Sequence, residues 1–190
     1  LADASARFAD TIGAIVSAAR TTLVTTLVQS EATIRNLLGN VASYARIDAG
    51  IDDLAGVCVG QPAVVVSPGP SLRRNAHLLA RPGLHDRCVI IAVQTTLRPL
   101  LAMGVRPHFV VALDYHEISR RFYEHLTPED VEGVTLVVEP KVSPAVLRAF
   151  PGAIRCVGDA MLERLLGPSL APGHAPLKQG ATVAHLAHAF

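Results

Sequence analysis

The stretch SPGPS, residues 67–71, contains residue types that hold anions at the start of a helix. It follows the apolar run AVVV, and we predict that Ser71 caps a helix beginning at Leu72. The first N–H groups of that helix would then face outward, and Gly69 would let a ligand approach the backbone. A phosphate is the natural occupant of such a corner. A stiff turn with a helix cap and no ligand is the alternative.

Neither of two established phosphate-binding motifs fits this corner. No lysine follows as in G-x-x-x-x-G-K-[ST], and one glycine is too few for G-x-G-x-x-G. The residue types alone therefore leave the ligand open.

The spacing of histidines and cysteines predicts no metal site. His185 and His188 stand three residues apart, but no H-E-x-x-H motif and no third ligand accompany them. Cys58, Cys88 and Cys156 are odd in number and widely spaced, which fits neither a disulfide framework nor a zinc motif. Because Cys88 and Cys156 lie in apolar runs, we predict buried thiols and a reducing, cytoplasmic compartment.

Five short β-branched runs are predicted to be the strands that position the corner. They lack polar alternation, which suits strands covered on both faces, as in parallel sheets. Segments of helical length separate them, so we predict an α/β fold with a Rossmann-like, doubly wound, mostly parallel sheet. The runs are 63–67, 88–93, 109–113, 134–139 and 154–157, and the helical segments are 72–80, 95–103, 117–125, 144–150 and 160–166.

The first 60 residues are predicted to form a helical appendage to a sheet domain at residues 61–190. Apolar residues recur at threes and fours from Phe8 to Val41, which indicates a helical stripe. Gly39 and Asn40 tolerate the left-handed conformation that closes helices, so we expect the helix to stop there. The Thr-rich middle also allows a break near Ser30.

The composition argues against binding of nucleic acid and against membrane insertion. The chain has 190 residues, a net charge of +1, no basic block and 4% aromatics, so it lacks an electrostatic footprint and stacking platforms for nucleic acid. The apolar stretch 11–30 carries Arg20 at its middle, which costs about 2.5 kcal/mol or more on insertion. The last segment opens a helical pattern at Gly180 without a closing cap, so we expect the domain to continue past Phe190.

Three ordered motifs resemble a known family. They are SPGPSL, IIAVQTTLRPLLAMGVRPHFVVALD and KQGATVAHLAHAF. Together they are similar to the domain shared by the motility-associated factor (Maf) glycosyltransferases and the MptE-like 6-hydroxymethylpterin diphosphokinases, from about Ala63 to the C-terminus. Three positions depart from the family pattern: Ser67 replaces a glycine, His108 replaces an acidic residue, and residues 179–182 replace a G-G-S run.

The resemblance implies transfer of a nonulosonic acid from a CMP-activated donor to serine or threonine of a protein acceptor such as flagellin. Backbone donors at the corner would stabilise the charge that grows on the leaving phosphate. The residues after the second run would contact ribose or base, and the final motif would add N–H donors. These candidate donor-binding residues are Ser67, Gly69, Pro70 and Ser71; Gln94 and Thr95; and Gly180, Ala181 and Thr182.

Two residues after the third run are the catalytic candidates. Asp114 could bind a hydroxyl or a metal, and its alternative is a turn-forming Asp that caps the helix from His116 onward. His116 is the candidate general base for the acceptor hydroxyl because an imidazole titrates near neutrality, and its alternative is an exposed loop histidine. Lys178, Arg73 and Arg74 could attract the anion or be ordinary solvated surface residues.

Two other functions stay open. A diphosphokinase would need ATP and Mg²⁺, and Asp114, Glu139 and Asp159, each at the end of a predicted strand, would favour it. A non-catalytic nucleotide-binding module would fit Ser67 in place of a glycine. No cofactor is firmly implied, since the CMP-sugar is a substrate and Mg²⁺ enters only with the kinase.

Overall fold

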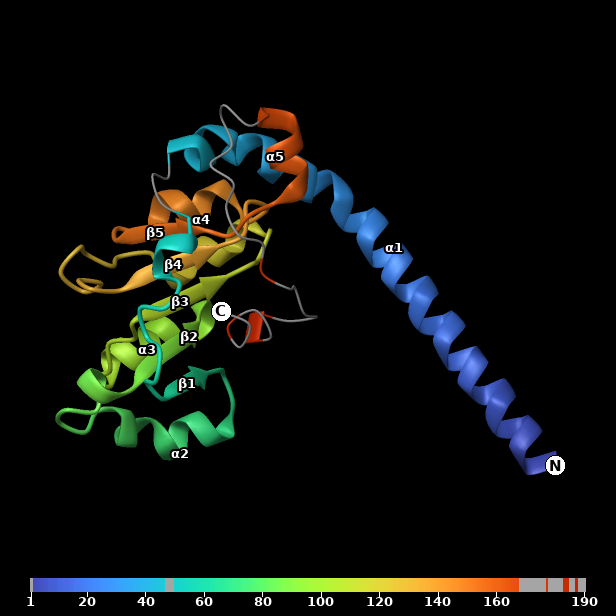
Figure 1. Cartoon of the computed structure of the whole chain (residues 1–190), viewed down its shortest axis with the longest axis horizontal. Coiled ribbons are helices and arrows are strands. Elements are labelled where there is room, and N and C mark those ends of the chain that lie inside the picture. The colour runs from blue at the N-terminus through green and yellow to red at the C-terminus, as the bar shows by residue number, and fades with distance from the viewer. Residues whose placement is uncertain (1, 47–49, 168–176, 178–182, 185–186, 188–190) are drawn as a thin grey trace.

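The computed structural model describes residues 2–46, 50–167, 177, 183–184 and 187. At its centre lies a parallel sheet of five short strands in the order β1-β2-β3-β4-β5 (Figure 1). Their bounds are β1 Ala63–Val66, β2 Val89–Val93, β3 Phe109–Ala112, β4 Thr135–Val138 and β5 Ala153–Cys156. Each strand lies within, or at most one residue outside, the run from which it was predicted.

Because all the strands are parallel, their carboxyl ends lie at one edge of the sheet. The register pairs Val64 with Ile90, Ala92 with Val110 and Leu136 with Ile154. We call the end of the sheet that follows Val66, Val93, Ala112, Val138 and Cys156 the carboxyl edge. The polar segments that follow the strands begin there.

Alternate residues of each strand enter two separate apolar clusters, as the two-residue period of a strand requires. The larger cluster holds Ile90, Val110 and Leu136 together with the helices on that face. These helices are α2 (Pro70–Leu79), α3 (Leu97–Ala102), α4 (Pro144–Ala149) and α5 (Ala160–Leu166). The smaller cluster holds Ile91 and Val111, and the residues that cover this second face include Ile51 and Ala187.

The predicted α/β, Rossmann-like fold with an N-terminal helix is confirmed. Among the described strands the order runs from β1 to β5 without a reversal. Helices α2–α5 all contribute to the larger cluster, so all four lie on the same face of the sheet. Short 3₁₀ segments complete this part of the chain: η1 (Asp52–Leu54), η2 (His85–Arg87), η3 (Gln94–Thr96) and η4 (Glu117–Phe122). The domain boundary at residue 60 stays a prediction.

The N-terminal helix α1 (Ala2–Arg46) is one continuous helix of 45 residues, without a break near Ser30. The predicted stop at Gly39 and Asn40 is wrong because packing against the sheet domain uses both residues inside the helix. A Cβ on Gly39 would lie 3.3 Å from Pro144 Cγ, so the glycine permits close approach to α4. The Asn40 side chain is buried and donates to two carbonyls of the segment after β4.

The N-terminal two thirds of α1 project away from the sheet, and their large apolar side chains are exposed (Figure 1). The helix is long and apolar enough between Arg7 and Ala45 to cross a membrane by length and composition, which alone is a weak indication. The absence of membrane insertion stays a prediction. The exposed apolar residues in this part are Phe8, Ile12, Ile15, Val16, Leu23, Val24, Leu27 and Val28.

Candidate functional site

The corner after β1 is built differently from its prediction. Helix α2 begins at Pro70, with Gly69 as the N-cap residue and no side-chain capping bond. Ser71 is therefore the second residue of the helix, and its predicted capping role is wrong. Proline suits the first helical position because its φ is already fixed and its missing N–H would have had no partner there. Gly69 has φ 174°, extended backbone that any residue adopts, so its size is its only distinguishing property.

The ends of β1 and β2 are tied together beside this corner. Thr96 Oγ1 donates to the carbonyl of Val66 at 3.3 Å and to that of Val93 at 2.8 Å. Gln94 is buried, and its Oε1 accepts a bond from Tyr123 Oη at 3.3 Å. Gln94 was predicted to contact a ligand, but its side chain is buried and already bonded to Tyr123.

Thr95 is exposed, and together with Gln94 it lines a cavity of about 480 Å³. Arg98 and Arg121 also line this cavity, and Arg98 Nη1 lies 3.4 Å from the carbonyl oxygen of Arg121. This cavity lies between the segments that follow β2 and β3, and Glu124 is an acidic residue among its lining residues. The two arginines line the same cavity as Gln94 and Thr95, for which the sequence predicted contacts to a nucleotide.

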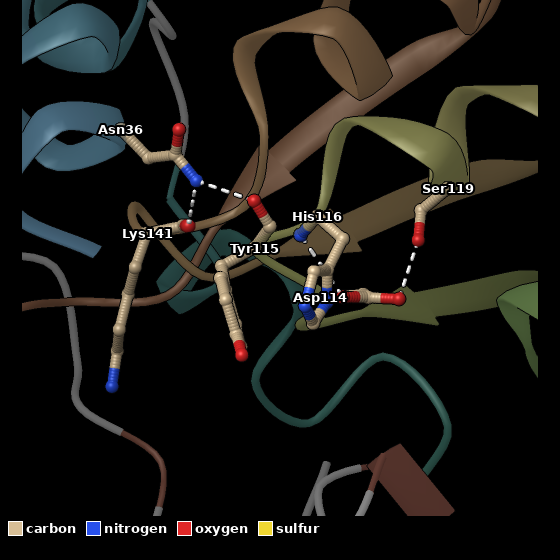
Figure 2. A network of polar contacts seen from close by, with 6 residues as sticks. All are labelled: Asn36, Asp114, Tyr115, His116, Ser119 and Lys141. Carbon is tan, nitrogen blue, oxygen red and sulfur yellow. Dashed lines mark hydrogen bonds and ion pairs between the residues drawn. The ribbon is translucent and has the colours of Figure 1, made fainter. Parts of the chain in front are cut away.

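Asp114 and His116 form a hydrogen-bonded pair after β3 (Figure 2). Asp114 Oδ1 lies 2.8 Å from His116 Nδ1 and accepts the His116 backbone N–H at 3.0 Å. Ser119 Oγ donates to the other carboxylate oxygen, Oδ2. The Asp114 and His116 side chains are 30% and 57% exposed. Asp114 therefore has the turn-forming role of its alternative interpretation and also orients an imidazole that solvent reaches.

These bonds hold Asp114 in its charged form. Burial works to raise the pKa of Asp114, but the bonds from Ser119 and from the backbone and ring of His116 outweigh burial and lower it. The carboxylate is thus a stable acceptor for Nδ1–H, which leaves Nε2 as the ring nitrogen that faces away from the carboxylate. A histidine held in this way can take a proton at Nε2.

Two asparagines of α1 hold the segments after β3 and β4, and sequence reasoning missed both. Asn36 Nδ2 donates to the carbonyls of Tyr115 at 2.7 Å and Lys141 at 3.1 Å (Figure 2). Asn40 Nδ2 donates to those of Pro140 and Val142, both at 2.7 Å. The signal was a pair of amides four residues apart, which lie on the same side of a helix.

Two further carboxylates at the carboxyl edge have structural partners. Glu139 follows β4, is buried, and its Oε2 lies 3.3 Å from Lys141 Nζ. Burial raises the pKa of Glu139, against the lowering effect of Lys141. Asp159 caps α5 by accepting the N–H groups of Met161 and Leu162. Within the described residues, no group of three His, Cys, Asp or Glu side chains is placed to hold a metal ion.

Spacing in the sheet decides which candidates lie together. The corner after β1 and Asp114 after β3 are separated by one strand, or about 10 Å. Gly180, Ala181 and Thr182 lie outside the described residues, as do Lys178, His185 and His188.

His108, the departure from the family pattern in the middle motif, precedes β3 and lies at the opposite edge of the sheet from the candidate site. Its Nδ1 accepts the N–H of Ile90 at 3.0 Å, and its ring stacks on His85. Burial and the neighbouring His85 lower the pKa of His108. Its role is structural.

Comparison with known proteins decides the family. A family model described as 6-hydroxymethylpterin diphosphokinase MptE-like matches residues 35–190. The chain belongs to the MptE-like family. The family match begins inside α1 and includes Asn36 and Asn40, so the part of the helix that contacts the candidate site lies within it. No curated protein matches this MptE-like chain.

A solved structure has a similar fold to this MptE-like chain. It is that of the Maf glycosyltransferase from Magnetospirillum magneticum AMB-1, with a TM-score of 0.52 and 23% sequence identity. The similarity covers 79% of this chain and 24% of that protein. The MptE-like chain thus spans about a quarter of the length of the glycosyltransferase whose fold it shares.

Proposed function

We propose that this MptE-like domain transfers a sugar from a nucleotide-activated donor to a hydroxyl of a protein. The observation that carries the proposal is the Asp114–His116 pair at the carboxyl edge, with Nδ1 bound to a carboxylate and the ring accessible to solvent. In parallel α/β sheets, ligands bind beyond the carboxyl ends of the strands. The fold shared with a Maf glycosyltransferase supports the choice of reaction.

The donor is a CMP-activated nonulosonic acid, of the pseudaminic or legionaminic type. Its phosphate binds at the exposed start of α2, where Gly69, Pro70 and Ser71 begin the helix and the N–H groups and helix dipole favour an anion. Thr95 after β2, Arg98 of α3 and Arg121 of η4 line the neighbouring cavity and contact the nucleotide from that side. The strand spacing of about 10 Å between the corner and Asp114 allows a nucleotide-sugar to extend from one to the other.

The chemical step is a nucleophilic displacement at the anomeric carbon of the donor sugar. The acceptor oxygen of a serine or threonine, in a protein such as flagellin, forms a bond to this carbon, and the bond from the carbon to the phosphate oxygen breaks. The electron pair leaves with CMP, and the hydroxyl proton passes to His116 Nε2. Asp114 holds the imidazole in place and stabilises the imidazolium that forms. We place this reaction in the cytoplasm, since the cysteines of the chain are free thiols, as is usual in a reducing compartment.

A diphosphokinase that uses ATP and Mg²⁺ is the second candidate, and the description of the family model favours it. The described carboxylates do not favour it. Asp114 accepts bonds from Ser119 and His116, Glu139 is paired with Lys141, and Asp159 caps α5. Among the described residues no three His, Cys, Asp or Glu side chains are grouped to hold a metal ion, so a magnesium ion would need the ATP phosphates as further ligands. A non-catalytic nucleotide-binding module is the third possibility.

Calorimetric titration with CMP, CDP, ATP and ADP, with and without Mg²⁺, separates the three. We expect CMP to bind without metal, and His116→Gln to retain that binding while losing transfer by about 10²–10⁴-fold. Binding of ATP that requires Mg²⁺ would select the kinase instead. If no nucleotide binds, both enzymatic functions fail. His77→Gln, an exposed histidine on α2, is the matched control and should keep full transfer.

A further inference from the structure

A second cavity opens on the other side of His116 from the corner. It has a volume of about 510 Å³, within the range of ligand sites. Its walls come from α1 with Arg35 and Asn36, from the segment after β3 with Tyr115 and His116, and from α4 with Pro144 and Arg148. Because β4 lies next to β3 on the side away from β1, this cavity and the corner flank His116 from opposite sides.

The walls of this cavity are held in place before any ligand arrives. Asn36 Nδ2 donates to the carbonyls of Tyr115 and Lys141, which fixes α1 against the segments after β3 and β4 (Figure 2). Gly39 lets α1 approach Pro144, so the third wall is fixed as well. A preorganised cavity loses less free energy on ordering when it binds a ligand.

The charges around the cavity favour an anionic ligand. Arg35 and Arg148 line it, and Glu117 is the acidic residue among the lining residues. Arg35 pairs with Glu31 at 2.6 Å, but the two side chains are 74% and 81% exposed. An ion pair so exposed contributes little, so the guanidinium can turn to a carboxylate of a ligand at small cost. Arg148 is exposed at the last turn of α4.

We propose that this cavity binds the acceptor, as a peptide segment in which a serine or threonine is flanked by acidic residues. The inference rests on the proposed transfer and names its acceptor class. Arg35 and Arg148 pair with the flanking carboxylates, while the hydroxyl meets His116 Nε2. The donor sugar reaches His116 from the corner and the acceptor reaches it from α1. Arg35 and Arg148 are specificity-determining residues, and His116 remains the catalytic one.

A charge swap on the 190-residue chain tests the proposal by binding alone. Two fluorescent peptides of the same sequence are titrated, one with serine between aspartates and one with serine between lysines. We expect wild-type protein to bind the acidic peptide about tenfold more tightly than the basic one, because the basic peptide cannot form charge-assisted pairs with Arg35 and Arg148. Arg148→Ala and Arg35→Ala should each weaken the acidic peptide, and Arg148→Glu should reverse the preference.

Controls separate this proposal from the function on which it rests. Arg87→Ala, in η2 at the opposite edge of the sheet, should leave both peptides unaffected, and circular dichroism checks that each variant folds. If wild-type protein binds both peptides equally or neither, or if Arg148→Glu keeps the original preference, the proposal is overturned even when CMP binds. If CMP displaces the acidic peptide and Arg148→Ala weakens CMP, the cavity holds the donor and the proposal again fails. If the peptide binds as expected but no nucleotide does, the peptide site stands and the transferase function falls.

Discussion

Gly39 of α1 and Pro144 of α4 approach so closely that a Cβ on the glycine would lie 3.3 Å from Pro144 Cγ. Such a distance is tighter than ordinary van der Waals contact, so even a methyl group would require the proline ring to yield. This contact closes the wall of the cavity beside His116. This contact also explains why a glycine lies inside α1, where glycine otherwise destabilises a helix by about 1 kcal/mol relative to alanine.

We expect Gly39→Leu to lower the free energy of unfolding by about 1–3 kcal/mol, because the larger side chain overpacks the junction of α1 with α4. Gly13→Leu is the matched control, since no atom lies within 4 Å of the Cβ that it would add. Replacing Gly13 should stabilise the helix by at most about 1 kcal/mol. Urea denaturation measures both variants, and equal stabilities would contradict the close contact.

Asn40→Ala should lower the free energy of unfolding by about 2 kcal/mol, because the carbonyls of Pro140 and Val142 lose a buried donor. Asn75, an exposed residue on α2, provides the control, and Asn75→Ala should change stability by less than about 0.5 kcal/mol. Thermal unfolding followed by circular dichroism compares the two. A loss as small for Asn40 as for Asn75 would mean that α1 is not held by this side chain.

Ser119→Ala should raise the pKa of Asp114, because the serine hydroxyl stabilises the charged carboxylate. Since the folded-state pKa of Asp114 lies below its ordinary value of 3.8, its ionised form stabilises the protein above that pH. This contribution is lost as the pH falls through the lowered pKa. NMR titration of the Asp114 carboxyl carbon measures the pKa directly. An unchanged pKa in Ser119→Ala would show that the bond is not formed in solution.

Glu139→Gln should stabilise the protein at neutral pH, because burial makes the charged form of Glu139 costly and the amide keeps the shape. The pKa of Glu139 is raised, so relative to an exposed glutamate its protonated form stabilises the fold below the ordinary pKa. That contribution is lost as the pH rises through the raised pKa. The gain from Gln should therefore shrink in acid. Unfolding at pH 7 and pH 4 tests this, with exposed Glu132→Gln as the control, and a loss of stability at pH 7 would contradict it.

Four of the five strands were predictable because each is a short run rich in β-branched residues, which suits a parallel sheet, whereas β5 has Ile154 as its one β-branched residue. The predictions that failed rested on local signals that tertiary contacts override. Gly39 and Asn40 have the residue types of a helix end, yet Pro144 and two carbonyls about 100 positions away determine their role. Ser71 has the residue type of a helix cap, but Pro70 before it already suits the first helical position.

The candidate site was predictable in part for the same physical reason. Asp114 and His116 are two residues apart after a strand, so their contact is local and follows from sequence. Asn36 lies 79 positions before Tyr115, and no spacing rule links the two residues. The cavity beside His116 depends on that distant contact, and only the fold discloses it.

Helix α1 has a mechanical consequence for the site that it touches. Its 45 residues make a stiff rod of about 68 Å, and Asn36 and Asn40 fasten only its last third to the segments after β3 and β4. A tilt of the helix would therefore turn about its contact with α4 at Gly39. A displacement of about 4 Å at the far end would tilt the helix by about 4° and strain the bonds from Asn36 to the carbonyls of Tyr115, which precedes His116, and Lys141.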